Sequence, residues 1–215
     1  GKNEDAISIL DSYKINISEE LHDIIIKNSL PQLHNTPKYM LATPMMALKN
    51  AAKVADEQGF IPIILSDTLE GEAHAEGKKM AELALQIKKD KKYKNINLNK
   101  PIILLSGGET TVTVKGDGKG GRNTEFMLSM AINLDKMKGI SALAIDTDGI
   151  DGIEDNAGAY ISENTLNKAS SSDLNPENYL SNNDSYTFFK SIDDLIYTSP
   201  TLTNVNDFRA VLIES

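Results

Sequence analysis

Three short apolar runs, each followed by a polar loop, alternate in this chain with segments whose apolar residues have helical spacing. The runs are Phe60–Leu65, Pro101–Leu105 and Ser141–Ile145. Alternation of strands and helices is typical of α/β proteins, because the connecting helices cover the faces of the sheet. We therefore expect an α/β fold: a layered, mixed parallel/antiparallel sheet with flanking helices, in which the alternation favours a large parallel part.

Capping and turn residues place the boundaries of the expected elements. Ser18 is a plausible helix N-cap, Pro44 suits a first helical turn, and Gly59 suits a helix end. A polar connector with two prolines, residues 30–37, looks like a linker. We expect helices over residues 5–13, 18–27, 44–58, 72–89 and 122–137 and near Asn164 and Asp184, and strands over 39–43, 60–65, 101–105, 110–114, 141–145, 195–197 and 208–213.

Composition excludes several classes of protein. The chain has 215 residues, which predicts one main domain plus an extra segment. Its net charge of −9 would repel a phosphate backbone, so we expect no nucleic-acid partner. It has no cysteine, which excludes disulfides and thiolate metal sites. The apolar runs are too short to span a bilayer and no signal peptide opens the chain, so we expect no membrane partner and a cytoplasmic location.

Arginine is rare in this chain. Of the 22 basic residues only Arg122 and Arg209 are arginine, and the others are lysine. An arginine kept against such a bias can be needed for its planar, bidentate guanidinium. We therefore expect a functional role for Arg122 in particular.

Two glycine-containing loops are candidate anion sites. The first follows the strand 101–105, where ligands bind in open α/β sheets, and two adjacent glycines allow close backbone approach. The second places four glycines before a helix, whose start offers free N–H groups and Arg122. Glu125 fits an N-terminal capping arrangement there. The predicted ligand-binding residues are Ser106, Gly107, Gly108, Glu109 and Thr110 in the first loop and Gly120, Gly121 and Asn123 in the second. Plain turns remain the alternative for both.

Standard phosphate-binding motifs fit the second loop poorly. Gly116, Gly118 and Gly121 satisfy G-x-G-x-x-G, but no acidic residue ends a clear next strand about 20 residues further on. The spacing of a P-loop is also present, but Arg122 and Asn123 stand where Lys and Ser/Thr are required. The sequence therefore predicts a flexible glycine loop that delivers an arginine at a helix start.

The other candidates are acidic or amide residues. Asp148 and Asp151 lie in a loop after the strand 141–145, and Asp148 is our candidate Mg²⁺ ligand. An acidic turn without metal is the alternative. Further polar contacts are predicted at Asn183, Asn204, Asn206 and Asp207, of which Asn183 reads equally as part of a helix cap. The three histidines lie outside these loops and form no His-x-x-x-His pair, so zinc is not expected.

Five segments together resemble, in order and spacing, the MOFRL domain of class II glycerate kinases. They are Leu105–Val114, Gly120–Phe126, Thr147–Gly152, Asn183–Ser185 and Thr203–Asp207. Residues 5–10 and 65–73 also resemble segments of that family. One departure is Leu202, which stands where the family usually has a glycine.

The resemblance implies ATP-dependent phosphorylation of D-glycerate to 2-phosphoglycerate with Mg²⁺, and a catalytic role for Arg122 as a clamp on the transferring phosphoryl group. Family members are longer and carry an N-terminal Rossmann-like half. The resemblance therefore implies a fragment: residues 1–37 as a remnant of that half and a linker, residues 38–215 as the C-terminal α/β domain, and a MOFRL segment at about 101–213.

The expected partners are glycerate, a nucleotide and the missing N-terminal domain, without which we expect no turnover; a homodimer is also left open. Two other functions remain open at this point. One is an NAD(P)-dependent hydroxypyruvate reductase, a name that some family members carry. The other is a non-catalytic truncated binding domain.

Overall fold

The computed structural model describes residues 3–27, 37, 39–94, 96–97 and 99–214. The chain divides into two compact units, Gly1–Met40 and Leu41–Ser215. The first unit contains helices α1 (Asn3–Ser12) and α2 (Glu19–Lys27), and neither helix has a buried side chain. Ser18 Oγ accepts a hydrogen bond from Leu21 N at 3.2 Å, as predicted for a residue at this helix start.

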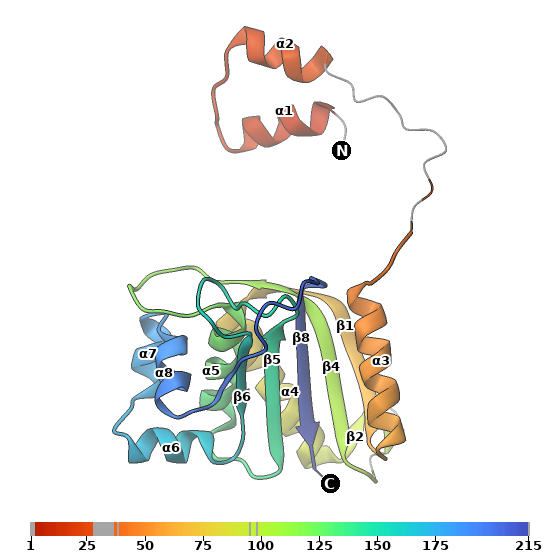
Figure 1. Ribbon diagram of the computed structural model, residues 1–215, viewed down its shortest axis with the longest axis vertical. Coiled ribbons are helices and arrows are strands. Elements are labelled where there is room, and N and C mark those ends of the chain that lie inside the picture. Colours follow the sequence, from red (N-terminus) through yellow and green to blue (C-terminus); the bar gives the residue numbers. More distant parts are fainter. Residues whose placement is uncertain (1–2, 28–36, 38, 95, 98, 215) are drawn as a thin grey trace. The chain divides into compact units, whose positions relative to one another are not determined.

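The second unit is a mixed sheet with helices, drawn in Figure 1. The strand order is β1-β4-β8-β5-β6-β7, and a separate hairpin is formed by β2 and β3. The strands are β1 (Ile61–Glu72), β2 (Lys92–Tyr93), β3 (Ile96–Asn97), β4 (Ile102–Thr111), β5 (Ile140–Asp146), β6 (Gly158–Ile161), β7 (Leu195–Ile196) and β8 (Asp207–Ile213). The helices are α3 (Pro44–Glu57), α4 (Ala73–Asp90), α5 (Arg122–Leu134), α6 (Thr165–Ser171), α7 (Pro176–Ser181) and α8 (Ser185–Ser191).

The expected fold class is confirmed, but the parallel part of the sheet is smaller than the alternation indicated. Only β1 and β4 pair in parallel, and every other strand pair of the six-stranded sheet is antiparallel. The reason is β8, which enters between β4 and β5 and runs against both. Periodicity reveals the helical crossovers, but it carries no information about a late strand that inserts between two earlier ones.

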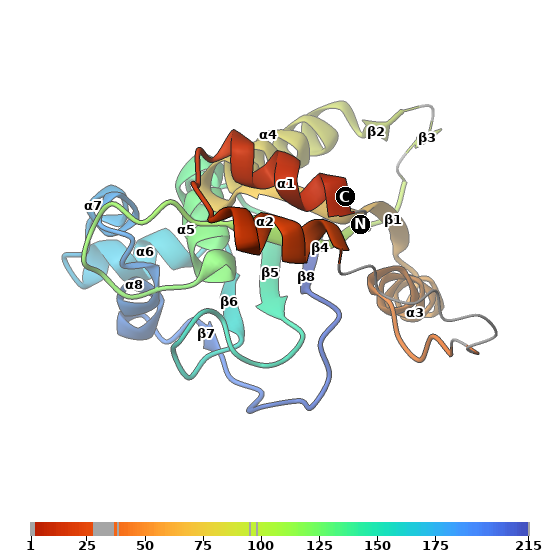
Figure 2. The same cartoon turned by 90° about the horizontal axis from the view of Figure 1, so that it is seen from above.

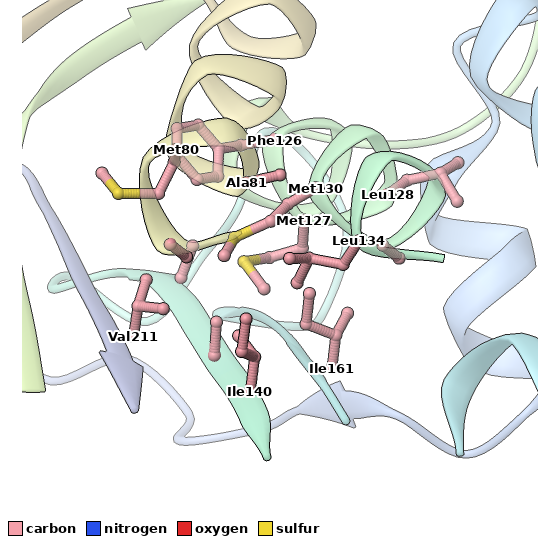
Figure 3. Packing of buried hydrophobic residues seen from close by; sticks show 14 of the residues in the cluster. Met80, Ala81, Phe126, Met127, Leu128, Met130, Leu134, Ile140, Ile161 and Val211 are labelled. Carbon is pink, nitrogen blue, oxygen red and sulfur yellow. The ribbon is translucent and has the colours of Figure 1, made fainter. Parts of the chain in front are cut away.

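The core lies between the sheet and helices α4 and α5. Alternate residues of β4, β5 and β8 point toward these helices, as the period of two in a strand requires. Figure 3 shows Phe126, Met127 and Met130 of α5 packed with Met80 of α4 above Val211 of β8. Helix α3 covers the opposite face near β4: a Cβ atom added to Gly107 would lie 3.5 Å from Leu48 Cδ1 of α3.

Several expected boundaries differ from the structure. Residues 66–68 and 106–109, predicted as loops, belong to β1 and β4, and residues 112–114 follow the end of β4. Residues 39–43, predicted as a strand, form none. Gly108 explains part of the extension: its φ is +113°, and an added Cβ would lie 2.2 Å from Leu69 N of β1. The second glycine of this pair therefore lets two strands approach closely.

The helices near Asn164 and Asp184 are confirmed as α6 and α8, whereas α7, β6 and the β2–β3 hairpin were missed. Among the helices in the described part of the chain, none has the length and apolar character needed to cross a bilayer.

Candidate functional site

One end of the sheet gathers the polar loops of the second unit. The connections after β4 and β5 and before β8 lie at this end in Figure 1, and Figure 2 views them from above. Because β8 is antiparallel, its first residue, Asp207, lies beside the ends of its neighbours: it pairs with Gly108 of β4 and with Asp146 of β5. Residues distant in sequence are thus brought to one edge.

Arg122 lies at this edge, at the first position of α5, and three carboxylates surround its guanidinium. Its Nε donates to Asp207 Oδ1 at 2.8 Å, and its Nη2 donates to Asp146 Oδ2 at 2.5 Å. Its Nη1 lies 3.4 Å from Glu109 Oε1. The Arg122 side chain is 23% exposed, Asp207 and Asp146 are buried, and Glu109 is exposed. Two buried acceptors therefore fix the guanidinium plane while one edge still faces solvent.

Asp207 joins several elements through one buried carboxylate. Besides Arg122, its Oδ1 accepts from Asn123 Nδ2 at 2.9 Å. Its Oδ2 accepts from Arg209 Nη2 at 2.5 Å and from Thr110 N at 3.4 Å. A charge taken fully out of water has to be paired and hydrogen-bonded, and here both arginines of the chain supply that pairing.

Arg209 lies beneath the site and does not reach the surface, since it is 1% exposed. Its guanidinium carbon lies 4.9 Å from the ring centroid of Phe126, and its Nη2 also donates to Thr110 Oγ1 at 3.1 Å. Burial lowers the pKa of Arg209 against the opposing effect of Asp207. These contacts assign Arg209 to supporting Asp207 from below.

Arg122 and its partner Asp146 both have shifted pKa values. Burial alone would lower the pKa of Arg122, but its hydrogen bond to Asp207 and the charges of Asp207, Asp146 and Glu109 outweigh burial and raise it. Burial raises the pKa of Asp146 to about 6, although the backbone N–H of Asp148 and the charge of Arg122 act in the opposite direction. A carboxyl group that titrates in this range beside a held arginine is typical of functional sites.

The glycine loop before α5 is packed against the turn at residues 182–185. Asn183 Oδ1 accepts from Lys115 N at 2.7 Å and from Gly116 N at 3.0 Å. The N–H of Gly118 donates to Asn182 O at 3.1 Å, and that of Lys119 to Asp184 Oδ1 at 2.9 Å. These four amides already have acceptors within the chain, so an anion could use them only by displacing Asn182, Asn183 or Asp184.

The glycines of this loop serve close packing. A Cβ atom added to Gly116 would lie 2.3 Å from Asn182 O, one on Gly118 2.4 Å from Asp184 Cβ, and one on Gly120 2.3 Å from Ser185 Oγ. Such contacts are shorter than real Cβ atoms make. Ligand contact of Gly120 and Gly121 through other atoms stays a prediction.

The N-terminus of α5 is occupied by a carboxylate from the acidic loop. Asp151, which is fully buried, accepts from Asn123 N at 2.9 Å and from Thr124 N at 2.8 Å. Thr124 Oγ1 completes the cap by bonding Gly121 N at 2.9 Å. Glu125 takes no part in this cap, which corrects its expected capping role. An anionic ligand would have to displace Asp151 to reach these two amides.

The remaining predicted residues hold the site's loops. Asp148 Oδ1 accepts from Ile150 N at 2.9 Å and its Oδ2 accepts from Asn204 Nδ2 at 3.2 Å. Asn206 N donates to Asn204 Oδ1 at 2.8 Å. Ser106 and Gly107 lie within β4, and Ser106 is buried. Leu202 has a φ of +60° and is 98% exposed, a conformation that suits glycine better.

The structure thus brings Arg122, Glu109, Thr110, Asn123 and Asp207 together. It places Asp151 and Asn183 in the scaffold around them. Sequence reasoning missed Asp146 as a partner of Arg122, although it directly follows the predicted strand 141–145. Among the described residues no three histidine or acidic side chains converge on a common metal position.

Comparison with known proteins places this geometry in a family. Residues 102–207 match the MOFRL family. The D-glycerate 2-kinase of Thermotoga maritima is 38% identical over 210 residues, covering 98% of this chain and 49% of that protein. A putative hydroxypyruvate reductase of Agrobacterium vitis is 46% identical over 216 residues, covering 98% of this chain and 55% of that protein.

The crystal structure of a glycerate kinase from Thermotoga maritima superposes with a TM-score of 0.86 at 36% identity, covering 99% of this chain and 50% of that chain. The chain therefore spans about half the length of these relatives.

Proposed function

Because this chain belongs to the MOFRL family, we propose that it forms the C-terminal part of an ATP-dependent glycerate 2-kinase. The reaction would transfer the γ-phosphoryl group of ATP to D-glycerate and yield 2-phosphoglycerate. The names of the relatives support a glycerate kinase, and the chain's own support is the position of Arg122.

Arg122 carries the proposal because it is held rigidly and remains accessible. Asp207 and Asp146 orient the guanidinium of Arg122 in advance. The side chain therefore does not have to be ordered during the reaction, which lowers the cost of reaching the transition state. Among the described residues, the ion-pair partner at Nη1 is Glu109, whose side chain is 53% exposed. An exposed ion pair of this kind is weak, so Glu109 can give way to phosphoryl oxygens at small cost. Arg122 would then stabilise the charge that spreads over those oxygens.

ATP and Mg²⁺ fit the described residues only in part. Mg²⁺ is commonly held by one or two carboxylates and by substrate phosphates, and half-buried Asp148 can supply one such carboxylate. Bound Mg²⁺ would neutralise charge on the phosphates. Most amides of the glycine loop already have acceptors, so we expect the main contacts to the nucleotide to come from side chains or from the part of the relatives outside this chain.

The direct test measures 2-phosphoglycerate formation from ATP and D-glycerate. We expect no product with this chain alone, and product when the chain is joined to the other half of its relatives. In the joined protein Arg122→Lys should lower kcat by about 10²–10³-fold, because lysine keeps the charge but loses the fork that Asp146 and Asp207 hold. Glu82→Gln, on the exposed side of α4, is the matched control. A near-normal rate for Arg122→Lys would remove Arg122 from catalysis.

A second candidate function is the reduction of hydroxypyruvate with NAD(P)H, because relatives from Agrobacterium vitis carry that name. The geometry of the loop at 116–121 argues against it. In a dinucleotide fold the pyrophosphate occupies the helix N-terminus, whereas here Asp151 holds the amides of Asn123 and Thr124. Titration with NADH separates the two functions: saturable binding at micromolar cofactor would favour the reductase.

A non-catalytic binding domain is the remaining alternative. It predicts that the joined protein binds ATP but forms no 2-phosphoglycerate, whatever residue stands at position 122. Product formation that depends on Arg122 would exclude it.

A further inference from the structure

A cavity whose lining includes none of the residues of the Arg122 cluster lies beside α5. Its volume is about 250 Å³, and it lies between α4, α5 and α7 beneath the segment that follows β4. Its polar end is lined by His74, Lys115, Glu125 and Asn183, and its apolar wall by Ile132 and Leu180. A cavity of this size suits a small metabolite, since drug-sized pockets begin at about 300 Å³.

Glu125 is the residue that makes this cavity unusual. Its side chain is only 5% exposed, and it has no part in the cap of α5. Its Oε2 accepts one hydrogen bond, from Asn183 Nδ2 at 2.9 Å. Its Oε1 faces His74 Nδ1 at 3.7 Å, which is longer than a hydrogen bond. A carboxylate can accept about four hydrogen bonds, and a buried one normally has its charge paired.

Among the described residues, the one ion-pair partner of that charge is His74, which is charged only when protonated. The His74 side chain is 50% exposed, and Glu72 also lies near it, with its Oε2 4.0 Å from His74 Nδ1. Glu72 is itself engaged by Thr113, whose N donates at 3.1 Å and whose Oγ1 donates at 2.5 Å. Lys115 lines the cavity, but no ion pair joins it to Glu125 within the described part of the chain. Burial accordingly raises the pKa of Glu125.

We propose that this cavity is a binding site for a small organic ammonium compound, whose –NH₃⁺ group donates to Glu125 Oε1 and whose short carbon chain packs on Ile132 and Leu180. An ammonium group supplies several donors and a permanent opposite charge, whereas His74 Nδ1 lies 3.7 Å from Glu125 Oε1 and is charged only when protonated. A bare metal ion fits less well: within the described residues no three acidic or histidine groups converge, and part of the wall is apolar. This site is separate from the proposed phosphoryl transfer and does not depend on it.

The binding test uses the whole chain and three probes of equal size and different charge: n-propylammonium, n-propanol and propionate, at matched ionic strength. Amide chemical shifts are followed by NMR. We expect n-propylammonium to bind with a dissociation constant on the order of millimolar, as its few heavy atoms allow. Its shifts should gather at residues around the cavity, such as Thr113, Glu125 and Ile132. Equal shifts from n-propanol, or shifts elsewhere on the chain, would overturn the proposal.

Two variants sharpen the test. Glu125→Gln keeps the shape and an acceptor for Asn183 but removes the charge, so it should weaken n-propylammonium binding about tenfold or more. Glu82→Gln removes an exposed carboxylate of α4 and should leave the affinity unchanged. His74→Ala, at a half-exposed position, removes a competitor for Oε1, so binding should stay at least as tight. Unchanged binding in Glu125→Gln contradicts the site. Lost binding in His74→Ala also contradicts it when the amide spectrum shows that this variant is folded.

Discussion

Replacement of Asp207 by asparagine tests the network beneath the candidate site most directly. Asparagine keeps the size of the side chain but removes the charge that pairs Arg122 and Arg209. The side chains of Asp207 and Arg209 are 0% and 1% exposed, so Arg209 would be left as a buried and uncompensated cation. Its only ion pair in the described part of the chain is with Asp207. An amide nitrogen would also face donors where an acceptor is required.

The expected cost follows from what is known of buried ion pairs. Removing one partner of such a pair costs about 3–5 kcal/mol, because the other charge stays buried. In a domain of this size each kcal/mol lowers Tm by roughly 2–4 °C, so Asp207→Asn should lower Tm by roughly 6–20 °C. The second unit holds Leu41–Ser215, and the transition measured is that of this unit.

Urea denaturation followed by circular dichroism gives the free energy of unfolding, and calorimetry gives Tm. Glu109→Gln is the matched control: it removes the exposed partner of Arg122 and should cost less than about 1 kcal/mol. If Asp207→Asn unfolds at the same urea concentration as Glu109→Gln, then Asp207 does not hold the charges that the geometry assigns to it.

Three further changes test other parts of the structure. Asp146 binds its proton more tightly in the folded state, with a pKa of about 6, so its contribution to the free energy of unfolding falls as pH rises from about 4 to 6 and is constant above. Asp146→Asn should lack this contribution, so the free energy of unfolding, measured by urea denaturation at several pH values, should fall less over this range than in the unchanged chain; an equal fall would contradict the assignment. Gly120→Ala should cost about 1–3 kcal/mol, measured by urea denaturation, since its Cβ would overlap Ser185 Oγ; no loss would show that this turn yields. Leu202→Gly should leave stability unchanged or raise it by up to about 1 kcal/mol, because relief from a left-handed φ offsets the entropy of glycine; a clear loss of Tm would mean that Leu202 has a packing role.

The sequence predicted the fold class because its strongest signals are local. The helix that begins at Arg122 and the strand that ends near Asp146 follow from apolar periodicity and from glycine placement. The antiparallel pairing of β8 with two strands did not follow, since strand order depends on contacts between residues about 60 to 100 positions apart, such as Asp146 with Asp207 and Ser106 with Arg209.

The site was predicted in part for the same reason. Arg122 stood out because arginine is rare in the chain, and its place at a helix start was readable from the glycines before it. The partners of its guanidinium were not readable, because Asp146, Asp207 and Glu109 meet only after the sheet has formed. The packing of the glycine loop against residues 182–185 was not readable either, since glycine permits close approach of a ligand and of the chain's own backbone equally well.

The position of β8 also determines when this unit can fold. The last strand of the chain fills the middle of the sheet and brings Asp207 and Arg209 with it. Until it arrives, β4 and β5 each keep an open edge with unpaired backbone groups, which is a surface prone to wrong strand pairing. A growing chain on the ribosome therefore cannot close its sheet or assemble the Arg122 cluster before residues 207–213 have emerged. The folding rate is then limited by a long-range step, and nascent or truncated chains are the species most exposed to aggregation.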